Sequence, residues 1–185
     1  MRRVAVVGSS GAGKTWLASR SAAALGVEHV ELDAIHHGPD WTALDAGQMR
    51  RMLEARLPVA GAWVADGNYE HKGGDLVRAR ADTIVWLDLP RWRVMAQLVP
   101  RTVWRAALRR PLWNGNRESF ADALARDPER SVIRWSWTQH AAMRERYGEQ
   151  VDERWLRLTN RRAVRGLLRR AAGAQSAASA PATAS

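Results

Sequence analysis

The sequence of 185 residues contains no cysteine, which removes disulfide bridges, thiolate nucleophiles and cysteine-based zinc sites from its chemistry. Apolar residues make up 46 % of the chain, yet no uninterrupted apolar run approaches the ~20 residues that span a bilayer. The run that follows Met1 is too short for a signal-peptide core, so we do not expect export. These features predict a soluble cytoplasmic protein with a single hydrophobic core.

Lysine is also scarce, because Lys14 and Lys72 are the only two and arginine supplies nearly all of the positive charge in a formal net charge of +10. A basic surface can bind nucleic acid largely without regard to sequence. However, abundant arginine and alanine together indicate genome-wide compositional bias, and arginine also suits bidentate binding of nucleotide phosphates. Nucleic acid is therefore an alternative partner and a nucleotide the favoured one, while oligomeric state is not indicated.

One glycine-rich segment carries specific chemistry. Residues 8–15, GSSGAGKT, directly follow the apolar run 4–7 and match the pattern G-x-x-x-x-G-K-[ST]. In such a loop the glycines let backbone N–H groups converge on a phosphate, the lysine reaches the β and γ oxygens, and the hydroxyl ligates Mg²⁺. We therefore expect ATP and Mg²⁺ as cofactors, with the nucleotide bound by Gly8, Ser9, Ser10, Gly11, Ala12, Gly13, Lys14, Thr15 and Trp16.

The chain alternates strand-like and helix-like segments. Strands are expected at 3–7, 27–32, 62–65, 83–87 and 155–158, and helices at 14–25, 44–57, 76–81, 91–110, 129–146 and 160–170. This alternation predicts an α/β fold with a parallel sheet covered on both faces. Residues 171–185, rich in Ala and Ser, have nothing to bury and are expected to form a disordered tail after a single domain at 1–170.

A phosphate loop alone does not distinguish kinases from GTPases, motors and transport ATPases. A guanine-specific switch needs an Asn-Lys-x-Asp element late in the sheet, and residues 159–162, TNRR, lack both its lysine and its aspartate. Motor and transport ATPases need more chain. The length favours a small kinase, and the open alternatives are a nucleic-acid-associated regulator that binds ATP without kinase activity and a slow ATPase.

Three further segments extend the pattern: Asp33, WVADGNY at 63–69, and IVWLDLP at 84–90 followed by an arginine-rich stretch. Together they resemble the adenylate-kinase-like proteins often labelled topology modulation proteins and, more distantly, shikimate and gluconate kinases. The resemblance covers about residues 1–170. It implies a three-layer P-loop NTPase of the nucleoside-monophosphate-kinase type, with a five-stranded parallel sheet in the order 2-3-1-4-5. It also implies a mobile, arginine-rich helical lid near residues 105–125.

Aspartates follow three of the apolar strands. Asp66 and Asp88 both stand where a carboxylate supports Mg²⁺. We assign the metal to Thr15 and Asp66, because Asp66-Gly67 resembles the Asp-Gly pair that related kinases place beside the phosphate loop, and we expect Asp88 to cap the next helix. Asp33 occupies the position where related kinases carry a carboxylate that orients or deprotonates the acceptor hydroxyl.

The acceptor is expected to contact Asp33, His36, Trp41, Gly67, Asn68 and Tyr69. A nucleoside monophosphate is the first candidate. Asn68 and Tyr69 replace the arginine that adenylate kinases use on AMP, so a small hydroxylated metabolite is the alternative. Most tryptophans are expected in the core, with Trp41, in a loop, as the exception; the core candidates are Trp63, Trp86, Trp92 and Trp104.

Arginines are expected to complete the site from the lid. Arg101, Arg105 and Arg109 follow an i, i+4 spacing that predicts one helix face, and Arg110 and Arg117 flank the Gly/Asn-rich lid segment. Phosphoryl transfer builds negative charge that an arginine from a closing lid stabilises. The predicted catalytic residues are therefore Lys14, Asp33, Asp66, Arg105, Arg109 and Arg117.

Overall fold

In a computed structural model, which describes residues 1–123, 125, 127 and 130–178, the chain folds around a five-stranded sheet. The strand order is β2-β3-β1-β4-β5, as expected, and every neighbouring pair is parallel. The strands are β1 (Arg3–Gly8), β2 (Glu28–Glu31), β3 (Trp63–Asp66), β4 (Thr83–Leu87) and β5 (Trp155–Leu158). Because all strands run the same way, their carboxyl ends meet at one edge, where α/β proteins place their ligands.

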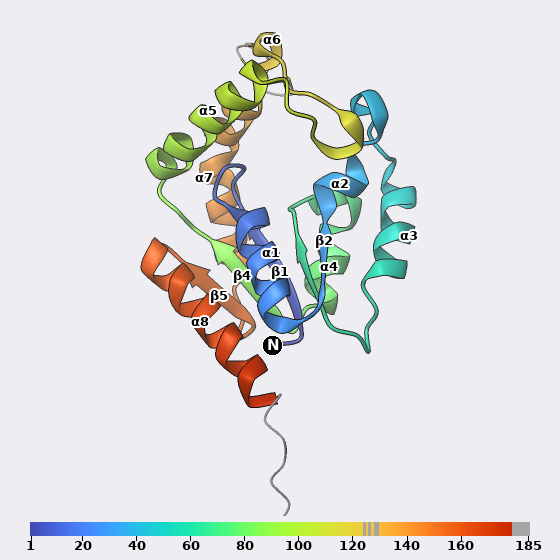
Figure 1. Cartoon of the computed structure of the whole chain (residues 1–185), viewed down its shortest axis with the longest axis vertical. Helices are drawn as coiled ribbons and strands as arrows, with labels where there is room; N and C mark the ends of the chain where they lie inside the picture. The colour runs from blue at the N-terminus through green and yellow to red at the C-terminus, as the bar shows by residue number, and fades with distance from the viewer. Residues whose placement is uncertain (124, 126, 128–129, 179–185) are drawn as a thin grey trace, which may run out of the picture.

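Helices cover both faces of the sheet and extend beyond its carboxyl edge (Figure 1). They are α1 (Lys14–Leu25), α2 (Leu32–His36), α3 (Ala46–Arg56), α4 (Asp75–Arg80), α5 (Arg91–Ala107), α6 (Phe120–Ala123), α7 (Val132–Gln150) and α8 (Arg161–Ala178). Three short helical turns join them: η1 (Pro39–Trp41), η2 (Glu70–Gly74) and η3 (Trp113–Gly115).

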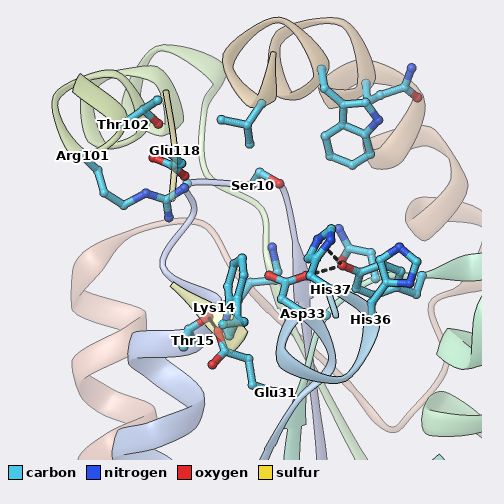
Figure 2. A pocket seen from close by; sticks show the side chains of 18 of the residues that line it. Ser10, Lys14, Thr15, Glu31, Asp33, His36, His37, Arg101, Thr102 and Glu118 are labelled. Carbon is cyan, nitrogen blue, oxygen red and sulfur yellow. Dashed lines mark hydrogen bonds between the residues drawn. The ribbon is translucent and has the colours of Figure 1, made fainter. Parts of the chain in front are cut away.

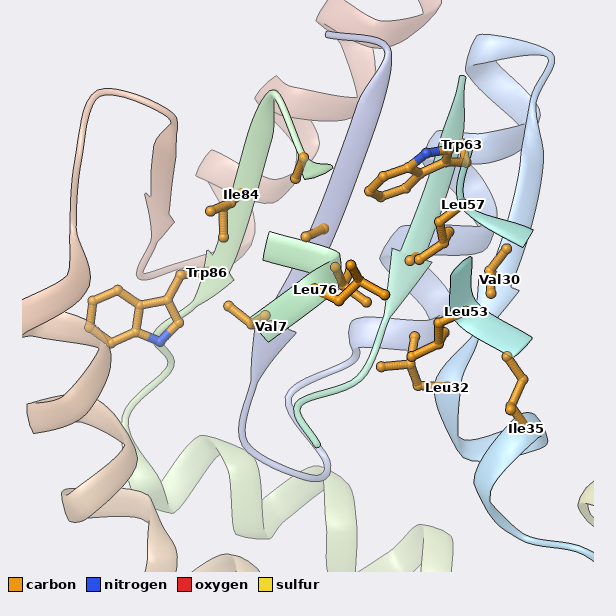
Figure 3. Packing of buried hydrophobic residues seen from close by; sticks show 14 of the residues in the cluster. Val7, Val30, Leu32, Ile35, Leu53, Leu57, Trp63, Leu76, Ile84 and Trp86 are labelled. Carbon is orange, nitrogen blue, oxygen red and sulfur yellow. The ribbon is translucent and has the colours of Figure 1, made fainter. Parts of the chain in front are cut away.

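The hydrophobic core forms two layers because alternate side chains of a strand point to opposite faces. Val4 and Val6 of β1 pack in one cluster with Leu17 of α1 and residues of α8. Ala5 and Val7 pack in the other, which includes side chains of α3, α4 and α7 and is drawn in part in Figure 3. The phosphate loop therefore starts from a strand that is buried on both sides.

The tryptophans divide between core and surface. Trp63 and Trp86 are 1 % and 2 % exposed, which confirms their expected place in the core. The same expectation is wrong for Trp92 and Trp104, which are 65 % and 48 % exposed. Helix α5 buries only one face, and Trp104 lies on the other. The guanidinium of Arg110 lies over the Trp104 ring, 4.3 Å from its centroid, and this cation–π contact stabilises the exposed ring.

The disordered tail was expected to begin at residue 171, but the structure continues in a helix beyond that point. Helix α8 continues to Ala178, and Ala171 is only 1 % exposed, so the ordered domain extends past residue 170. Alanine has the strongest intrinsic helix propensity, and the alanine-rich segment after Arg170 continues the helix. Residues 179–185 of the expected tail lie outside the described part of the chain.

The lid region lies above the carboxyl edge of the sheet, at the top of Figure 1. Helix α5 ends at Ala107, before the expected boundary, and the chain turns at Arg109, whose φ is +44°. Residues 111–117 then form a loop, closed by a bridge between Pro111 and Arg117, that reaches the α2–η1 segment (Figure 1). Within the described ranges, none of the helices combines the length and apolar character that crossing a bilayer demands.

Candidate functional site

The glycine-rich loop opens directly onto the N-terminus of α1. Gly8, Gly11 and Gly13 take φ values of +141°, +88° and +94°, which other residues rarely adopt. The helix begins at Lys14 with no capping side chain and no acidic residue in its first turn. The first amides of a helix have no intrahelical partner, so this end of α1 is suited to hold an anion, as the motif predicts.

Lys14 folds back over this loop. Its Nζ donates to the carbonyl oxygen of Ser9 at 3.3 Å. Burial lowers the pKa of the Lys14 ammonium, while the carboxylates of Asp33 and Asp66 act in the opposite sense. A phosphate bound in the loop would supply further negative charge and so favour the charged ammonium.

Thr15 and Asp66 form the pair predicted to hold Mg²⁺. The hydroxyl of Thr15 donates to Asp66 Oδ2 at 2.8 Å, and Asp66 is 2 % exposed. The other carboxylate oxygen, Oδ1, lies 2.7 Å from Nε2 of His29, a residue that the sequence analysis missed. Thr15 Oγ1 also lies 3.4 Å from Glu31 Oε1.

These oxygen donors fit a hard cation such as Mg²⁺. Among the residues the structure describes, no three His, Asp or Glu side chains are grouped as metal ligands. Thr15 and Asp66 are the side chains that would hold a magnesium ion, and the ion would neutralise charge on a bound phosphate. The register pairs Glu31 with Asp66 across β2 and β3, so knowledge of the strand order would have placed His29 and Glu31 beside this site.

Asp88 has a different role from the one expected. Helix α5 starts after Pro90 without a side-chain cap, so the expected capping by Asp88 is wrong. Asp88 is 4 % exposed and its carboxylate pairs with Arg144 at 2.7 Å and with Arg157 at 2.5 Å. A buried carboxylate needs compensating cations, and these two arginines hold it.

The sequence placed Asp33 directly after a strand, whereas it lies in helix α2, two residues beyond the end of β2 at Glu31. Its Oδ1 accepts a hydrogen bond from the hydroxyl of Tyr69 at 2.6 Å, and Nε2 of His37 lies 3.3 Å from that hydroxyl (Figure 2). Burial and the Asp33 carboxylate raise the pKa of Tyr69. Tyr69 therefore remains a donor and fixes the orientation of Asp33.

His36 stands beside this group. It is 8 % exposed, its ring lies 4.6 Å from that of Tyr69, and its Nδ1 is buried without a hydrogen-bond partner among the described residues. Burial, reinforced by the charge of Lys72, lowers the pKa of His36 to about 4. The imidazole is therefore neutral at neutral pH.

Gly67 and Asn68 directly follow β3 and contact the elements around the site. The Asn68 amide accepts from the Gly8 N–H at 3.2 Å and donates to the Gly8 carbonyl at 3.0 Å. A Cβ on Gly67 would lie 2.6 Å from that of Leu32, so the chain requires glycine there. Both residues border the cavity, and the Asn68 side chain fastens the segment after β3 to the phosphate loop.

Trp41 is held in place by the lid. Its backbone N–H donates to Asn116 Oδ1 at 2.9 Å and its indole N–H lies 3.4 Å from the Arg117 carbonyl. The ring of Trp113 stacks on that of His37, with centroids 5.6 Å apart. Burial raises the pKa of Glu31, and a hydrogen bond from Trp113 opposes that shift. The lid loop thus contacts both the acceptor side and the edge of the metal site.

The lid arginines are only partly where the sequence placed them. Arg101, Arg105 and Arg117 line the cavity, whereas Arg109 has left the helix and is not among its lining residues. Helix α5 packs directly on the phosphate loop, because a Cβ on Gly11 would lie 2.7 Å from the Cβ of Leu98. Arg101, one turn further along, lies beside the loop, across the cavity from His36 and His37 (Figure 2), and its buried Nε has no hydrogen-bond partner among the residues that the structure describes.

One cavity of about 1200 Å³ joins the phosphate loop, the acceptor side and the lid, and Asp66 and His29 are not among its lining residues. Pockets for one small ligand typically measure about 300–1000 Å³. The space is therefore large enough to hold a nucleotide and a second small molecule side by side.

No protein-family description and no curated protein matches the sequence. Solved structures do match: the shikimate kinase from Bacteroides thetaiotaomicron superposes with a TM-score of 0.54 at 14 % identity, over 95 % of this chain and 98 % of that one. This similarity shows the fold. The protein has an α/β fold with a five-stranded parallel sheet in the order 2-3-1-4-5, like the P-loop fold of that shikimate kinase.

Proposed function

We propose that this protein is an ATP-dependent kinase that transfers the γ-phosphoryl group of ATP to a small acceptor in the cytoplasm. The observation that carries the proposal is the shared cavity. The glycine-rich loop, Thr15 and the Asp33–Tyr69 pair all open into it, and the buried Asp66 is hydrogen-bonded to Thr15. A phosphate site, a metal site and a candidate base therefore lie within reach of one bound nucleotide.

Different groups of the chain act on the nucleotide phosphates and on the metal ion. Backbone amides at the start of α1 bind the β-phosphate, and Lys14 draws charge from the oxygens between the β and γ positions. Thr15 and Asp66 would hold Mg²⁺, which would neutralise phosphate charge and orient the phosphoryl group.

Asp33 and the lid act on the acceptor side. Asp33, fixed by Tyr69, orients the acceptor and takes its proton. Arg101, Arg105 and Arg117 border the same cavity and stabilise the charge that develops on the transferring group. The closed lid excludes water, which would otherwise compete as acceptor.

Two lysine variants test the proposal. Calorimetry with Mg²⁺·ATP measures binding, and ADP release with a panel of acceptors measures turnover. We expect Lys14→Ala to lose both. Lys72→Ala removes the only other lysine, whose Nζ contacts the Leu44 carbonyl, and it should bind ATP like the parent. ADP release by Lys14→Ala at the parent rate with every acceptor would overturn the kinase proposal.

A further inference from the structure

The outward side of helix α5 is apolar along its whole length. The helix lies at the outer edge of the molecule, to the left in the upper half of Figure 1. The structure describes all of α5, and every exposed residue in it is apolar: Trp92, Ala96, Val99, Pro100, Val103, Trp104 and Ala107. We call these seven residues the outer face of α5. Monomeric soluble proteins rarely leave a continuous apolar surface to water, so the outer face indicates a binding surface.

The other sides of α5 already have partners. Val94, Leu98 and Ala106 are buried, and Arg101 and Arg105 line the large cavity. None of the seven residues of the outer face lines that cavity. The outer face therefore serves neither the core nor the nucleotide site, and its composition needs another explanation.

An apolar groove continues this surface onto α7. The groove has a volume of about 410 Å³ and is lined by Met95, Val99, Ala123, Ile133, Arg134, Trp137 and Thr138. Arg134 is exposed and is the charged residue among these seven. The groove thus combines apolar side chains with a cation.

Arginines flank the outer face without carboxylates to balance them. Residues 89–117 contain seven arginines and no aspartate or glutamate. Four of these arginines stand at the two ends of α5 and form no ion pair with any described residue: Arg91, Arg93, Arg109 and Arg110. The surface around the outer face is therefore positively charged.

Three of the four arginines lie over exposed tryptophan rings. The distances from guanidinium to ring centroid are 5.0 Å for Arg91 on Trp137, 5.0 Å for Arg93 on Trp92 and 4.3 Å for Arg110 on Trp104. A guanidinium carries five N–H donors, so an arginine held on an indole can still bind a phosphate. Each exposed tryptophan of this surface is thus paired with a cation.

These charges distinguish the surfaces that would cover the outer face. A second copy of the chain, packed on the same face about a two-fold axis, would bring unpaired arginines against one another. Nucleic acid would supply phosphates, but the aliphatic side chains between the two arginine pairs offer it no hydrogen-bond donor. An anionic lipid surface supplies phosphates for the arginines and an apolar layer for the aliphatic side chains.

We propose that the outer face of α5 binds an anionic lipid surface, with its apolar side chains at the acyl boundary and the flanking arginines on headgroup phosphates. Tryptophan and arginine are typical of helices that lie in a membrane interface, and such a helix needs no spanning segment. The 17 residues of α5 extend about 25 Å, with Trp92 in the first turn and Trp104 in the last. The proposal does not depend on the kinase function.

Flotation of the full chain with lipid vesicles tests the proposal. One set of vesicles contains equal parts of phosphatidylglycerol and phosphatidylcholine, and the other contains phosphatidylcholine alone. We expect binding to the anionic vesicles to be about tenfold or more stronger than to the neutral ones. Because salt screens the arginines, about 0.5 M NaCl should weaken it.

An aspartate in the outer face separates this surface from general attraction by the net charge. Val103→Asp should weaken binding to anionic vesicles about tenfold or more, because its carboxylate would enter the acyl boundary among anionic headgroups. Met52→Asp is the matched control: Met52 is an exposed apolar residue of α3, and the variant changes the net charge equally. It should lose much less binding. Far-UV circular dichroism of both variants checks that they fold.

A pair of double variants tests the arginines. Arg91→Gln with Arg93→Gln should weaken binding about fivefold for each arginine removed. Arg165→Gln with Arg169→Gln removes two exposed arginines from α8 instead and should have a smaller effect. An equal loss in the two double variants would contradict headgroup binding at the start of α5.

The remaining outcomes are also decisive. No flotation with anionic vesicles would overturn the proposal, and so would an equal loss for Val103→Asp and Met52→Asp, which would show adsorption by net charge. A dimer in light scattering that Val103→Asp dissociates would show that a second copy covers the outer face instead. Failure to bind Mg²⁺·ATP would overturn the kinase proposal and leave this one standing.

Discussion

The side-chain amide of Asn116 pairs with the backbone on either side of η1. Its Oδ1 accepts the Trp41 N–H at 2.9 Å, and its Nδ2 donates to the Gly38 carbonyl at 2.8 Å. Asn116 is 4 % exposed, and Asn114 adds a bond from its Nδ2 to the Ala34 carbonyl at 3.3 Å. The lid loop and the acceptor side are therefore joined across the mouth of the cavity.

Removal of the Asn116 amide should open the cavity to water. Asn116→Ala removes the hydrogen bonds to the Trp41 N–H and the Gly38 carbonyl, each of which contributes about 0.5–1.5 kcal/mol, so we expect a looser lid. ADP release without acceptor should increase severalfold relative to acceptor-dependent release. Asn160→Ala makes the same change at an exposed position just before α8, where the amide accepts from the Ala163 N–H, and should leave that ratio unchanged. An equal ratio in the two variants would contradict a joining role for Asn116.

His29 should control the response to magnesium through Asp66. Its Nε2 lies 2.7 Å from Asp66 Oδ1, and loss of such an outer-shell partner typically costs about 10–100-fold in metal affinity. We expect His29→Ala to raise the Mg²⁺ concentration for half-maximal ADP release about tenfold or more, with partial rescue by His29→Gln. His71→Ala, at an exposed position, is the control. An unchanged magnesium titration in His29→Ala would exclude this positioning role.

Gly74 should tolerate no side chain. A Cβ there would lie 1.8 Å from the carbonyl oxygen of Asn68, the residue that fastens the segment after β3 to the phosphate loop. Since backbone must shift to relieve this overlap, Gly74→Ala should lower the free energy of unfolding by about 2 kcal/mol or more and weaken ATP binding. Gly148→Ala in α7, where a Cβ meets nothing within 4 Å, should instead stabilise by about 0.5–1 kcal/mol. Urea unfolding of both variants measures the difference.

His36 should make stability depend on pH. Its pKa is about 4 in the folded state and 6.5 as the reference value, so below pH 6.5 the unfolded chain takes up a proton that the folded protein refuses. The contribution is fully present above pH 6.5 and is lost as the pH falls toward 4. The loss amounts to at most about 3 kcal/mol.

Urea unfolding at pH 7 and pH 5 tests this dependence. His36→Gln should lose less stability between the two pH values than the parent does. His71→Gln removes an exposed imidazole and should behave like the parent. A parent-like pH dependence in His36→Gln would show that other groups cause the loss.

Local sequence patterns determined the strands, loops and helix starts whose formation depends on residues that are neighbours in the chain. The segment GSSGAGKT after an apolar run gave the strand, the loop and the start of α1, and the expected strands at 83–87 and 155–158 agree with β4 and β5. The strand order followed from family resemblance, and the superposition on a shikimate kinase supports it.

Only the tertiary structure decided which distant groups meet. Arg109 leaves the helix that its spacing predicted, because α5 ends where the lid must turn back toward η1. The contacts of Asn116 with Trp41 and of His29 with Asp66 join residues on separate segments, and of two tryptophans on α7, Trp135 lines the large cavity whereas Trp137 does not. Helix and strand periodicity fixes which side chains share a face, but the partner of that face is set by how the elements pack, which no local pattern encodes.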